Sequence, residues 1–259
     1  MKNIAVITGA SSGIGREFAV QIAKRADIDQ LWLIARSKDK LIQAAEEIYK
    51  QTSVPSLVMP FDLLEQDSFE KIENRLQKSD VNVKILVNSS GFGVSGDTLD
   101  MEIEPQLDMV DLNCRALLNM TYICLPYMSK GSNIVQIASA AAYVPQPGFA
   151  VYAATKSFVL SFSLALSYEL DKYGVSVTSV CPGPVDTNFF HANEKYNAVF
   201  PKSANLFFKK APFVVRKSIN AMNIHKRVVN PGMAVKMLCL ATAFYRKQVL
   251  AIVSKRFYR

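Results

Sequence analysis

Short apolar runs alternate with helix-length amphipathic segments along almost the whole chain, and this rhythm constrains the fold more than any single motif. The apolar runs, which predict strands, lie at 4–7, 31–35, 56–60, 84–88, 133–138, 175–180 and, more weakly, 226–229. The amphipathic segments, which predict helices, lie at 13–26, 38–50, 66–78, 101–128 and 150–173. Uninterrupted apolar runs suit strands buried on both faces of a parallel sheet. The pattern therefore predicts the α/β class: a doubly wound, Rossmann-type domain with a parallel sheet of about seven strands and helices on both faces.

We expect one domain that spans residues 1–259. A chain of 259 residues would suffice for one large α/β domain or two small ones. No internal repeat and no Gly/Ser-rich linker interrupts the alternation. Half of the residues are hydrophobic and a fifth are charged, which is typical of a globular protein with a sizeable core.

Two stretches depart from the alternation. Residues 187–225 are rich in Phe, Asn and Lys and contain two prolines. Because this fold binds ligands outside the carboxyl ends of its strands, we interpret 187–225 as a substrate lid, with an ordinary connection as the alternative. Residues 231–259 form a basic, apolar C-terminal segment.

The positive charge gathers at the C-terminal end. The net charge is +8, and residues 195–259 hold 14 Lys or Arg and no Asp or Glu. Such an end indicates an anionic substrate, an anionic membrane surface or simply a solvated face, whereas nucleic acid is not expected. The apolar part of 231–259 is too short and too often charged to cross a bilayer. It predicts either an interfacial helix that makes peripheral membrane contact or packing against protein.

The N-terminus and the cysteines indicate a cytoplasmic protein, with membrane association left open. The first predicted strand begins directly after Asn3, so we expect no signal peptide. Four widely spaced cysteines without a CxxC pair favour reduced thiols. His191 and His225 have no ligand-spaced partners, so no metal site is expected.

A glycine-rich turn follows the first predicted strand. Residues 8–15 read TGASSGIG. Gly9 permits the tight turn, Gly13 lets the backbone approach a pyrophosphate, and Gly15 lets the next helix pack closely on the sheet. Free N–H groups at the start of that helix then face the phosphates. Glycine also serves purely structural turns, but this position favours a dinucleotide, and the GxxxxGK[ST] pattern of nucleoside triphosphate sites is absent.

The end of the second predicted strand bears on the choice of dinucleotide. An NAD site usually holds Asp or Glu there, because a carboxylate binds the ribose hydroxyls. This chain has Ala35 followed by Arg36 and Ser37. A guanidinium can bind a 2′-phosphate through charge-assisted hydrogen bonds, so the cofactor is predicted to be NADP(H); a solvated arginine is the alternative.

Tyr152 and Lys156 stand four residues apart in a predicted helix, which puts both side chains on one face. An isolated phenol has a pKa of about 10, and a nearby ammonium is expected to lower it toward neutrality. The spacing is common by chance. However, Ser139 follows a buried strand, and in a doubly wound sheet its hydroxyl would share a crevice with this helix and the glycine turn.

Taken together, these motifs resemble those of the short-chain dehydrogenase/reductase family, in its single-domain branch and close to its hydroxysteroid dehydrogenases. The pieces that carry the resemblance are TGASSGIG at 8–15, Asp62-Leu63, Asn113, Ser139, Tyr152 with Lys156, and PGPVDT at 182–187. Their order and spacing extend over nearly the whole chain.

The resemblance implies a catalytic quartet of Asn113, Ser139, Tyr152 and Lys156. Tyr152 would be the acid for ketone reduction and the base for alcohol oxidation. Lys156 would bind the nicotinamide ribose and lower the pKa of Tyr152, Ser139 would orient the carbonyl, and Asn113 would help hold a water of the proton relay. The residues expected to bind NADP(H) are Gly9, Ser11, Ser12, Gly13, Ile14, Gly15, Arg36, Ser37, Asp62, Leu63, Ser89, Gly91, Tyr152, Lys156, Pro182, Gly183, Val185 and Thr187.

One segment departs from the family pattern. The usual Asn-Asn-Ala-Gly after the fourth strand reads here Asn88-Ser89-Ser90-Gly91. Ser89 replaces an amide that often braces the sheet and the adenosine edge. We therefore expect an effect on cofactor affinity more than on the chemistry.

The predicted activity is NADP(H)-dependent interconversion of a ketone and a secondary alcohol on an apolar substrate. By resemblance, a hydroxysteroid or bile acid is the favoured substrate, and a long-chain 3-oxoacyl thioester is the alternative. A different kind of function, a non-catalytic NADP(H)-binding protein that serves as a sensor or scaffold, is the second hypothesis. The basic end could attract an anionic group on the substrate.

Assembly is also predicted by resemblance. In the family, the long helices that correspond to 101–128 and 150–173 commonly pair between subunits, which implies a homodimer or homotetramer. The aromatic side chains that could wall an apolar pocket, or else belong to the core, are Phe149, Phe189, Phe190, Phe200, Phe207, Phe208 and Phe213.

Overall fold

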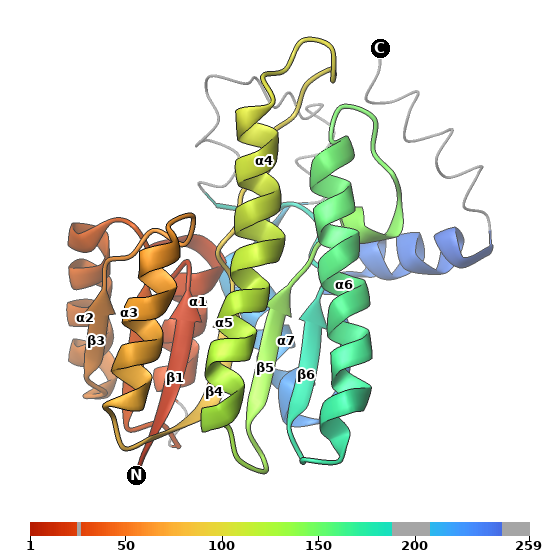
Figure 1. Ribbon diagram of the computed structural model, residues 1–259. Coiled ribbons are helices and arrows are strands. Elements are labelled where there is room, and N and C mark those ends of the chain that lie inside the picture. The colour runs from red at the N-terminus through yellow and green to blue at the C-terminus, as the bar shows by residue number, and fades with distance from the viewer. Residues whose placement is uncertain (25–26, 188–207, 245–259) are drawn as a thin grey trace.

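The computed structural model describes residues 1–24, 27–187 and 208–244 (Figure 1). Within them, seven parallel strands form one sheet in the order β3-β2-β1-β4-β5-β6-β9. These strands are β1 (Lys2–Thr8), β2 (Gln30–Ile34), β3 (Ser56–Met59), β4 (Val81–Asn88), β5 (Asn133–Ile137), β6 (Ser176–Val180) and β9 (Val228–Val229). The doubly wound, Rossmann-type fold predicted from the alternation is confirmed.

Helices cover both faces of the sheet (Figure 1). One face carries α1 (Gly13–Ala23), α2 (Lys38–Thr52) and α7 (Ala211–Asn223). The other face carries α3 (Gln66–Gln77), α4 (Glu104–Val110), α5 (Ala116–Cys124) and α6 (Ala150–Asp171). This is the two-layer covering that buries strands without polar faces.

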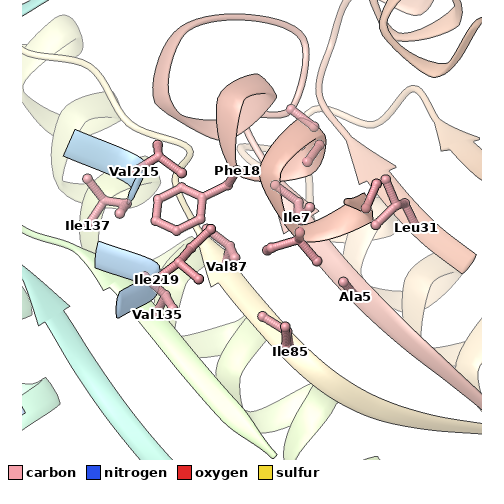
Figure 2. Close-up of a cluster of buried hydrophobic side chains, with 14 of the residues drawn as sticks. Ala5, Ile7, Phe18, Leu31, Ile85, Val87, Val135, Ile137, Val215 and Ile219 are labelled. Carbon is pink, nitrogen blue, oxygen red and sulfur yellow. The ribbon is translucent and has the colours of Figure 1, made fainter. Parts of the chain in front are cut away.

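Successive side chains of β1 pack in two separate hydrophobic cores, because the side chains of a strand point alternately to the two faces of the sheet. Ile7 belongs to the core under α1 and α7, whereas Val6 belongs to the core on the opposite face. In Figure 2, Phe18 of α1 and Ile219 of α7 lie over Ile7 and the neighbouring strands. Both faces of the sheet are therefore closed to water.

The chain order reverses between β1 and β4. From β1 the sheet grows through β2 to β3 on one side, and from β4 through β5 and β6 on the other. In parallel sheets, ligands bind in the crevice outside the carboxyl ends of the strands at this switch point. The turn after β1 and the ends of β4, β5 and β6 are thereby brought to one place.

The helix predicted at 101–128 begins later and is not uniform. It starts at Glu104, with Pro105 in its first turn, a position that proline tolerates because no N–H is needed there. A π-helical turn, Asp111–Arg115, then separates α4 from α5, and a 3₁₀ turn, Leu125–Tyr127, ends the segment. An inserted π turn rotates the side chains that follow, and such turns are frequent at functional sites.

The segment predicted as a lid is divided by the structure. Residues 188–207 lie outside the described residues, whereas Ala211–Asn223 form α7, whose Val215 and Ile219 are buried in the core beside α1. The lid interpretation is therefore wrong for α7. A short parallel pair, β7 (Val185–Asp186) with β8 (Lys209–Lys210), joins the two chain positions that flank 188–207.

One described helix is long and apolar enough, by length and composition, to cross a membrane. This helix is α6, which packs against β6 and β5 and carries Tyr152 and Lys156. Part of its apolar character is explained by side chains that it buries in the core, such as Val159 and Leu166. The last described helix, Met233–Phe244, is shorter.

Candidate active site

A cavity of about 460 Å³ lies at the carboxyl edge of the sheet. Every residue predicted to bind the cofactor contributes to its lining, from the turn after β1 to Thr187. Ser139, Tyr152 and Lys156 line it as well. Asn113 does not line the cavity and lies behind its wall. Segments more than a hundred residues apart in the chain thus form one elongated site.

The glycine turn is held by a very close backbone approach. Gly9 has a φ of +66°, which L-residues with a side chain rarely adopt. A Cβ atom on Gly15 would lie 2.3 Å from the carbonyl oxygen of Gly9, so a side chain there would force the helix off the turn. Ser12 caps α1 without a side-chain hydrogen bond, and the first turn of α1 has no acidic residue. The N–H groups of this turn therefore suit an anionic ligand.

Two cations stand at the outer end of the cavity, after β2. Arg36 and Lys40 both line it, and within the described residues neither forms an ion pair with a carboxylate. By contrast, Arg16 of α1 is paired with Glu47 of α2. Lys40 was not among the predicted site residues, although its place in the first turn of α2, four residues after Arg36, is the signal that could have found it.

The loop Asn88-Ser89-Ser90-Gly91 is held by a residue that the sequence did not single out. The hydroxyl of Thr8, at the end of β1, accepts hydrogen bonds from the backbone N–H groups of Ser89 and Ser90, each at 3.0 Å. The amide of Asn88 donates to the hydroxyl of Thr121 at 3.1 Å. The sheet is therefore braced at this loop although Ser89 has no amide side chain.

Ser139, Tyr152 and Lys156 meet at the inner end of the cavity. A hydrogen bond joins the hydroxyl groups of Ser139 and Tyr152. The Nζ atom of Lys156 lies 5.8 Å from the centre of the Tyr152 ring and donates to the carbonyl oxygen of Ile137 at 3.0 Å. The three side chains come from the end of β5 and from one face of α6, as the four-residue spacing predicted.

Burial controls the titration of both groups on α6. It raises the pKa of Tyr152 to about 12, against the opposing effect of the hydrogen bond with Ser139. It also lowers the pKa of Lys156 to about 8. In the protein alone, the loss of hydration therefore outweighs the effect of Ser139, and the lowering of the pKa of Tyr152 by Lys156 stays a prediction for the complex with the cofactor.

Asn113 lies in the π-helical turn and is 1% exposed. Its amide nitrogen donates to the carbonyl oxygen of Phe92 at 2.9 Å and to the hydroxyl of Thr155 at 3.1 Å. Its amide oxygen accepts from the N–H group of Phe92 at 3.1 Å. Both amide hydrogens are thus used, and Asn113 ties the loop after β4 to α6.

Gly93 touches the ring of Tyr152 and was not predicted as a site residue. A Cβ atom on Gly93 would lie 2.9 Å from Cδ2 of Tyr152, closer than real Cβ contacts. The absence of a side chain at this position therefore sets how deeply the tyrosine ring can sit in the cavity. A glycine just after a strand end in the predicted crevice is the only signal that the sequence offered.

We expect Gly93→Ala to lower kcat about ten- to a hundred-fold, because a small displacement of an acid–base group from its productive position is costly. Steady-state kinetics with a fixed ketone would measure the loss. Gly148→Ala is the matched control, since a Cβ there has open space around it and meets only the strain of a φ of +77°. Equal losses in the two variants would contradict a specific role for Gly93.

Comparison with known proteins agrees with this geometry. The profile of the family described as short chain dehydrogenase matches residues 3–197. The chain is 33% identical over 196 residues to sulfoacetaldehyde reductase 2 of Chromohalobacter salexigens, an alignment that covers 73% of this chain and 75% of the relative.

The chain belongs to the short-chain dehydrogenase family. It is 34% identical over 236 residues to the very-long-chain 3-oxoacyl-CoA reductase of Bos taurus, covering 87% of this chain and 73% of that protein. Among solved structures, a short-chain dehydrogenase from Sphingobium yanoikuyae in complex with NADPH superimposes with a TM-score of 0.80 at 26% identity, covering 96% and 95% of the two chains. A 7beta-hydroxysteroid dehydrogenase shares the fold, with a TM-score of 0.82 at 17% identity and coverage of 98% and 96%.

Family membership establishes the class of reaction. This short-chain dehydrogenase is an oxidoreductase that acts on CH–OH groups with a nicotinamide dinucleotide. The resemblance found in the sequence motifs is thereby confirmed, and the reading as a non-catalytic binding protein is not supported.

Proposed function

We propose that this short-chain dehydrogenase interconverts a ketone and a secondary alcohol on an apolar substrate with NADP(H), and that a hydroxysteroid or bile acid is its best substrate. The observation that carries the proposal is the hydrogen-bonded pair Ser139 and Tyr152, with Lys156 beneath it, at the inner end of a cavity built for a dinucleotide. Two neighbouring hydroxyl groups of this kind can both donate hydrogen bonds to the carbonyl oxygen of one substrate.

The cavity suits two parts of the cofactor, the charged phosphates and the reactive nicotinamide. The glycine turn presents N–H groups to phosphates, and the bound nicotinamide would supply or accept the hydride. The backbone of Pro182 is hydrogen-bonded to Ala140, next to Ser139, and Thr187 lies against Gly13 of the glycine turn. Pro182, Gly183, Val185 and Thr187 all line the cavity and are proposed to hold the nicotinamide end. Asp62 and Leu63, which line the other part, are proposed to face the adenine.

The roles of the side chains follow from their chemistry. Ser139 and Tyr152 donate hydrogen bonds to the substrate carbonyl and stabilise its developing negative charge. Because burial raises the pKa of Tyr152, its phenol holds a proton at neutral pH and can donate it to that oxygen. Lys156 orients the nicotinamide ribose and supplies a positive charge beside Tyr152. Asn113 positions the loop after β4, which forms part of the cavity wall.

The preference for NADP(H) rests on the two cations after β2, which form no ion pair with another side chain among the residues that the structure describes. A 2′-phosphate at this end would meet Arg36 and Lys40, and Ala35 stands directly after the strand, where an NAD site usually holds Asp or Glu for the ribose hydroxyls. The neighbour from Sphingobium yanoikuyae is described in complex with NADPH.

The substrate side of the cavity is mainly apolar. Phe92 and Phe149 line it near Tyr152, together with Ala141. Of the other phenylalanines predicted to wall a pocket, Phe213 packs against the core, Phe208 is not in the lining, and the rest lie outside the described residues. A long-chain 3-oxoacyl thioester is the alternative substrate, supported by the bovine relative.

A substrate panel tests the proposal. Ketosteroids, oxo bile acids and 3-oxoacyl thioesters would be offered with NADPH, and their alcohols with NADP⁺, at neutral and alkaline pH. We expect reduction to be the faster direction at neutral pH and oxidation to gain as the pH rises, because the raised pKa of Tyr152 makes its base form scarce. Turnover of thioesters alone would select the alternative substrate, and no turnover of any compound would overturn the proposal.

The proposal extends to assembly and location. Leu107 and Val110 of α4 and Phe158 and Tyr168 of α6 are exposed on the outer face of the sheet's helical layer. We propose that this face pairs two or four copies. All four cysteines are free thiols, which supports the proposed cytoplasmic location.

A further inference from the structure

The last described helix carries an exposed apolar stripe. Met233, Met237, Leu240 and Phe244 are 70%, 65%, 64% and 75% exposed. Their spacing of four, three and four residues places all of them within an arc of about 60° on one side of the helix. We call these four side chains the C-terminal stripe. Single exposed apolar residues are ordinary, but a continuous row marks a surface that meets another apolar phase.

The opposite side of the same helix is attached to the fold. Val235 and Thr242 are buried. The Cγ2 atom of Val235 lies 3.1 Å from the position that a Cβ on Gly183 would occupy, and Cys239, also on this side, lies near the hydroxyl of Tyr143. These contacts orient the helix, so the C-terminal stripe is held facing outward.

Positive charge borders the C-terminal stripe. Lys236 is exposed on the same helix, and the side chain of Lys209 lies beside Gly232 at the start of the helix. Arg246 and Lys247 follow Phe244 in the sequence, and the whole stretch 195–259 has no acidic residue. A symmetric contact between two copies would bring these cations together, which disfavours a second copy as the occupant. An anionic surface is complementary to them.

The helix that carries the stripe lies next to the substrate crevice, with the stripe on its outer side. Gly183, which Val235 contacts, lines the cavity close to Ser139. In Figure 1 this helix, the last coloured in blue, appears at the level of the carboxyl ends of β5 and β6. A surface bound by the stripe would therefore be separated from the cavity by this helix.

We propose that the C-terminal stripe and its flanking cations dock this protein on the surface of an anionic lipid bilayer. The helix would lie in the plane of the interface, with the four apolar side chains among the lipid chains and the cations at the headgroups. The described part of this helix, Met233–Phe244, is shorter than a bilayer-spanning helix, and the contact that we propose is peripheral. The proposal does not depend on which substrate is reduced.

Vesicle flotation of the full chain tests the proposal. Neutral phosphatidylcholine vesicles would be compared with vesicles that also contain phosphatidylglycerol. We expect binding to the anionic vesicles, weak binding to the neutral ones, and loss of binding as salt screens the charges. The double variant Met237→Glu/Leu240→Glu should bind at least about tenfold more weakly, because it removes apolar burial and reverses local charge.

A matched pair of substitutions controls for charge alone. Leu99 and Ile224 are also exposed, at 94% and 72%, but lie outside this helix, so Leu99→Glu/Ile224→Glu adds the same charge and should leave vesicle binding unchanged. Both variants should keep the thermal midpoint and the turnover of a water-soluble ketone. Equal binding by the stripe variant and the wild type, or no binding by the wild type, would overturn the proposal. A change in oligomeric state confined to the stripe variant, measured by light scattering, would instead assign the stripe to a second copy.

Discussion

The Tyr152→Phe variant is expected to lose about a hundred- to ten-thousand-fold in turnover while its affinity for NADPH stays within a few fold of the wild type. The substitution removes one hydroxyl, which is hydrogen-bonded to Ser139 and is the group proposed to donate the proton to the substrate oxygen. The ring remains, so its packing against Gly93 and Phe149 is kept. Steady-state rates with the best ketone of the panel and NADPH titration by fluorescence measure the two quantities.

A second tyrosine on the same helix provides the control. Tyr168 is exposed and lies outside the cavity, so Tyr168→Phe should keep wild-type turnover. Turnover of Tyr152→Phe close to that of Tyr168→Phe would mean that another group delivers the proton, and the proposed roles would fail. Weakened NADPH binding would instead assign Tyr152 a part in holding the cofactor.

The second large effect concerns cofactor choice. Arg36→Asp is expected to lower kcat/KM for NADPH about a hundred-fold and to leave kcat/KM for NADH unchanged or improved. Loss of charge-assisted hydrogen bonds to the 2′-phosphate costs about 1.5–3 kcal/mol, and the new carboxylate adds repulsion. The same carboxylate can accept hydrogen bonds from the free ribose hydroxyls of NADH.

Lys38→Asp is the matched control, because it makes the same charge change two residues away and Lys38 does not line the cavity. Its ratio of NADPH to NADH activity should stay near that of the wild type. Equal changes in the two variants would show that overall charge, and not contact with Arg36, sets the preference. A wild-type enzyme that prefers NADH would contradict the assignment of Arg36 directly.

The two predictions address different ends of one cavity, and so their effects should be separable. Tyr152 lies at the inner end with Ser139, and Arg36 lies after β2 at the outer end. Substitutions that far apart, without shared partners, usually act independently. The double variant should therefore combine a loss in turnover with a change in cofactor preference.

Local features of this protein could be predicted because their causes are local. The turn at 8–15 needs glycine wherever a strand passes directly into a phosphate-binding helix, and the four-residue spacing of Tyr152 and Lys156 sets their common face on α6. Uninterrupted apolar runs require a sheet that is covered on both sides, so the doubly wound class followed from the order of runs and amphipathic segments.

Contacts between distant segments were decided only by the tertiary structure. The role of α7 as a core helix depends on how α1 lies beside it, and the hold of Thr8 on Ser89 and Ser90 joins two strands about eighty residues apart. The contact of Gly93 with Tyr152 and the placing of Asn113 behind the cavity arise in the same way. None of these partners is close in the sequence, so no spacing could reveal them.

By itself, the sequence determined the α/β class, the place of the phosphate-binding turn and the residues gathered at the crevice, since strand and helix periodicity and the residue types of the turns carry that information. The tertiary structure decided the protonation of the site. Burial, a property of the whole fold, raises the pKa of Tyr152 and lowers that of Lys156, whereas the sequence showed only the neighbouring ammonium. It likewise decided which side of the last helix is attached to the fold, and therefore which apolar side chains face outward.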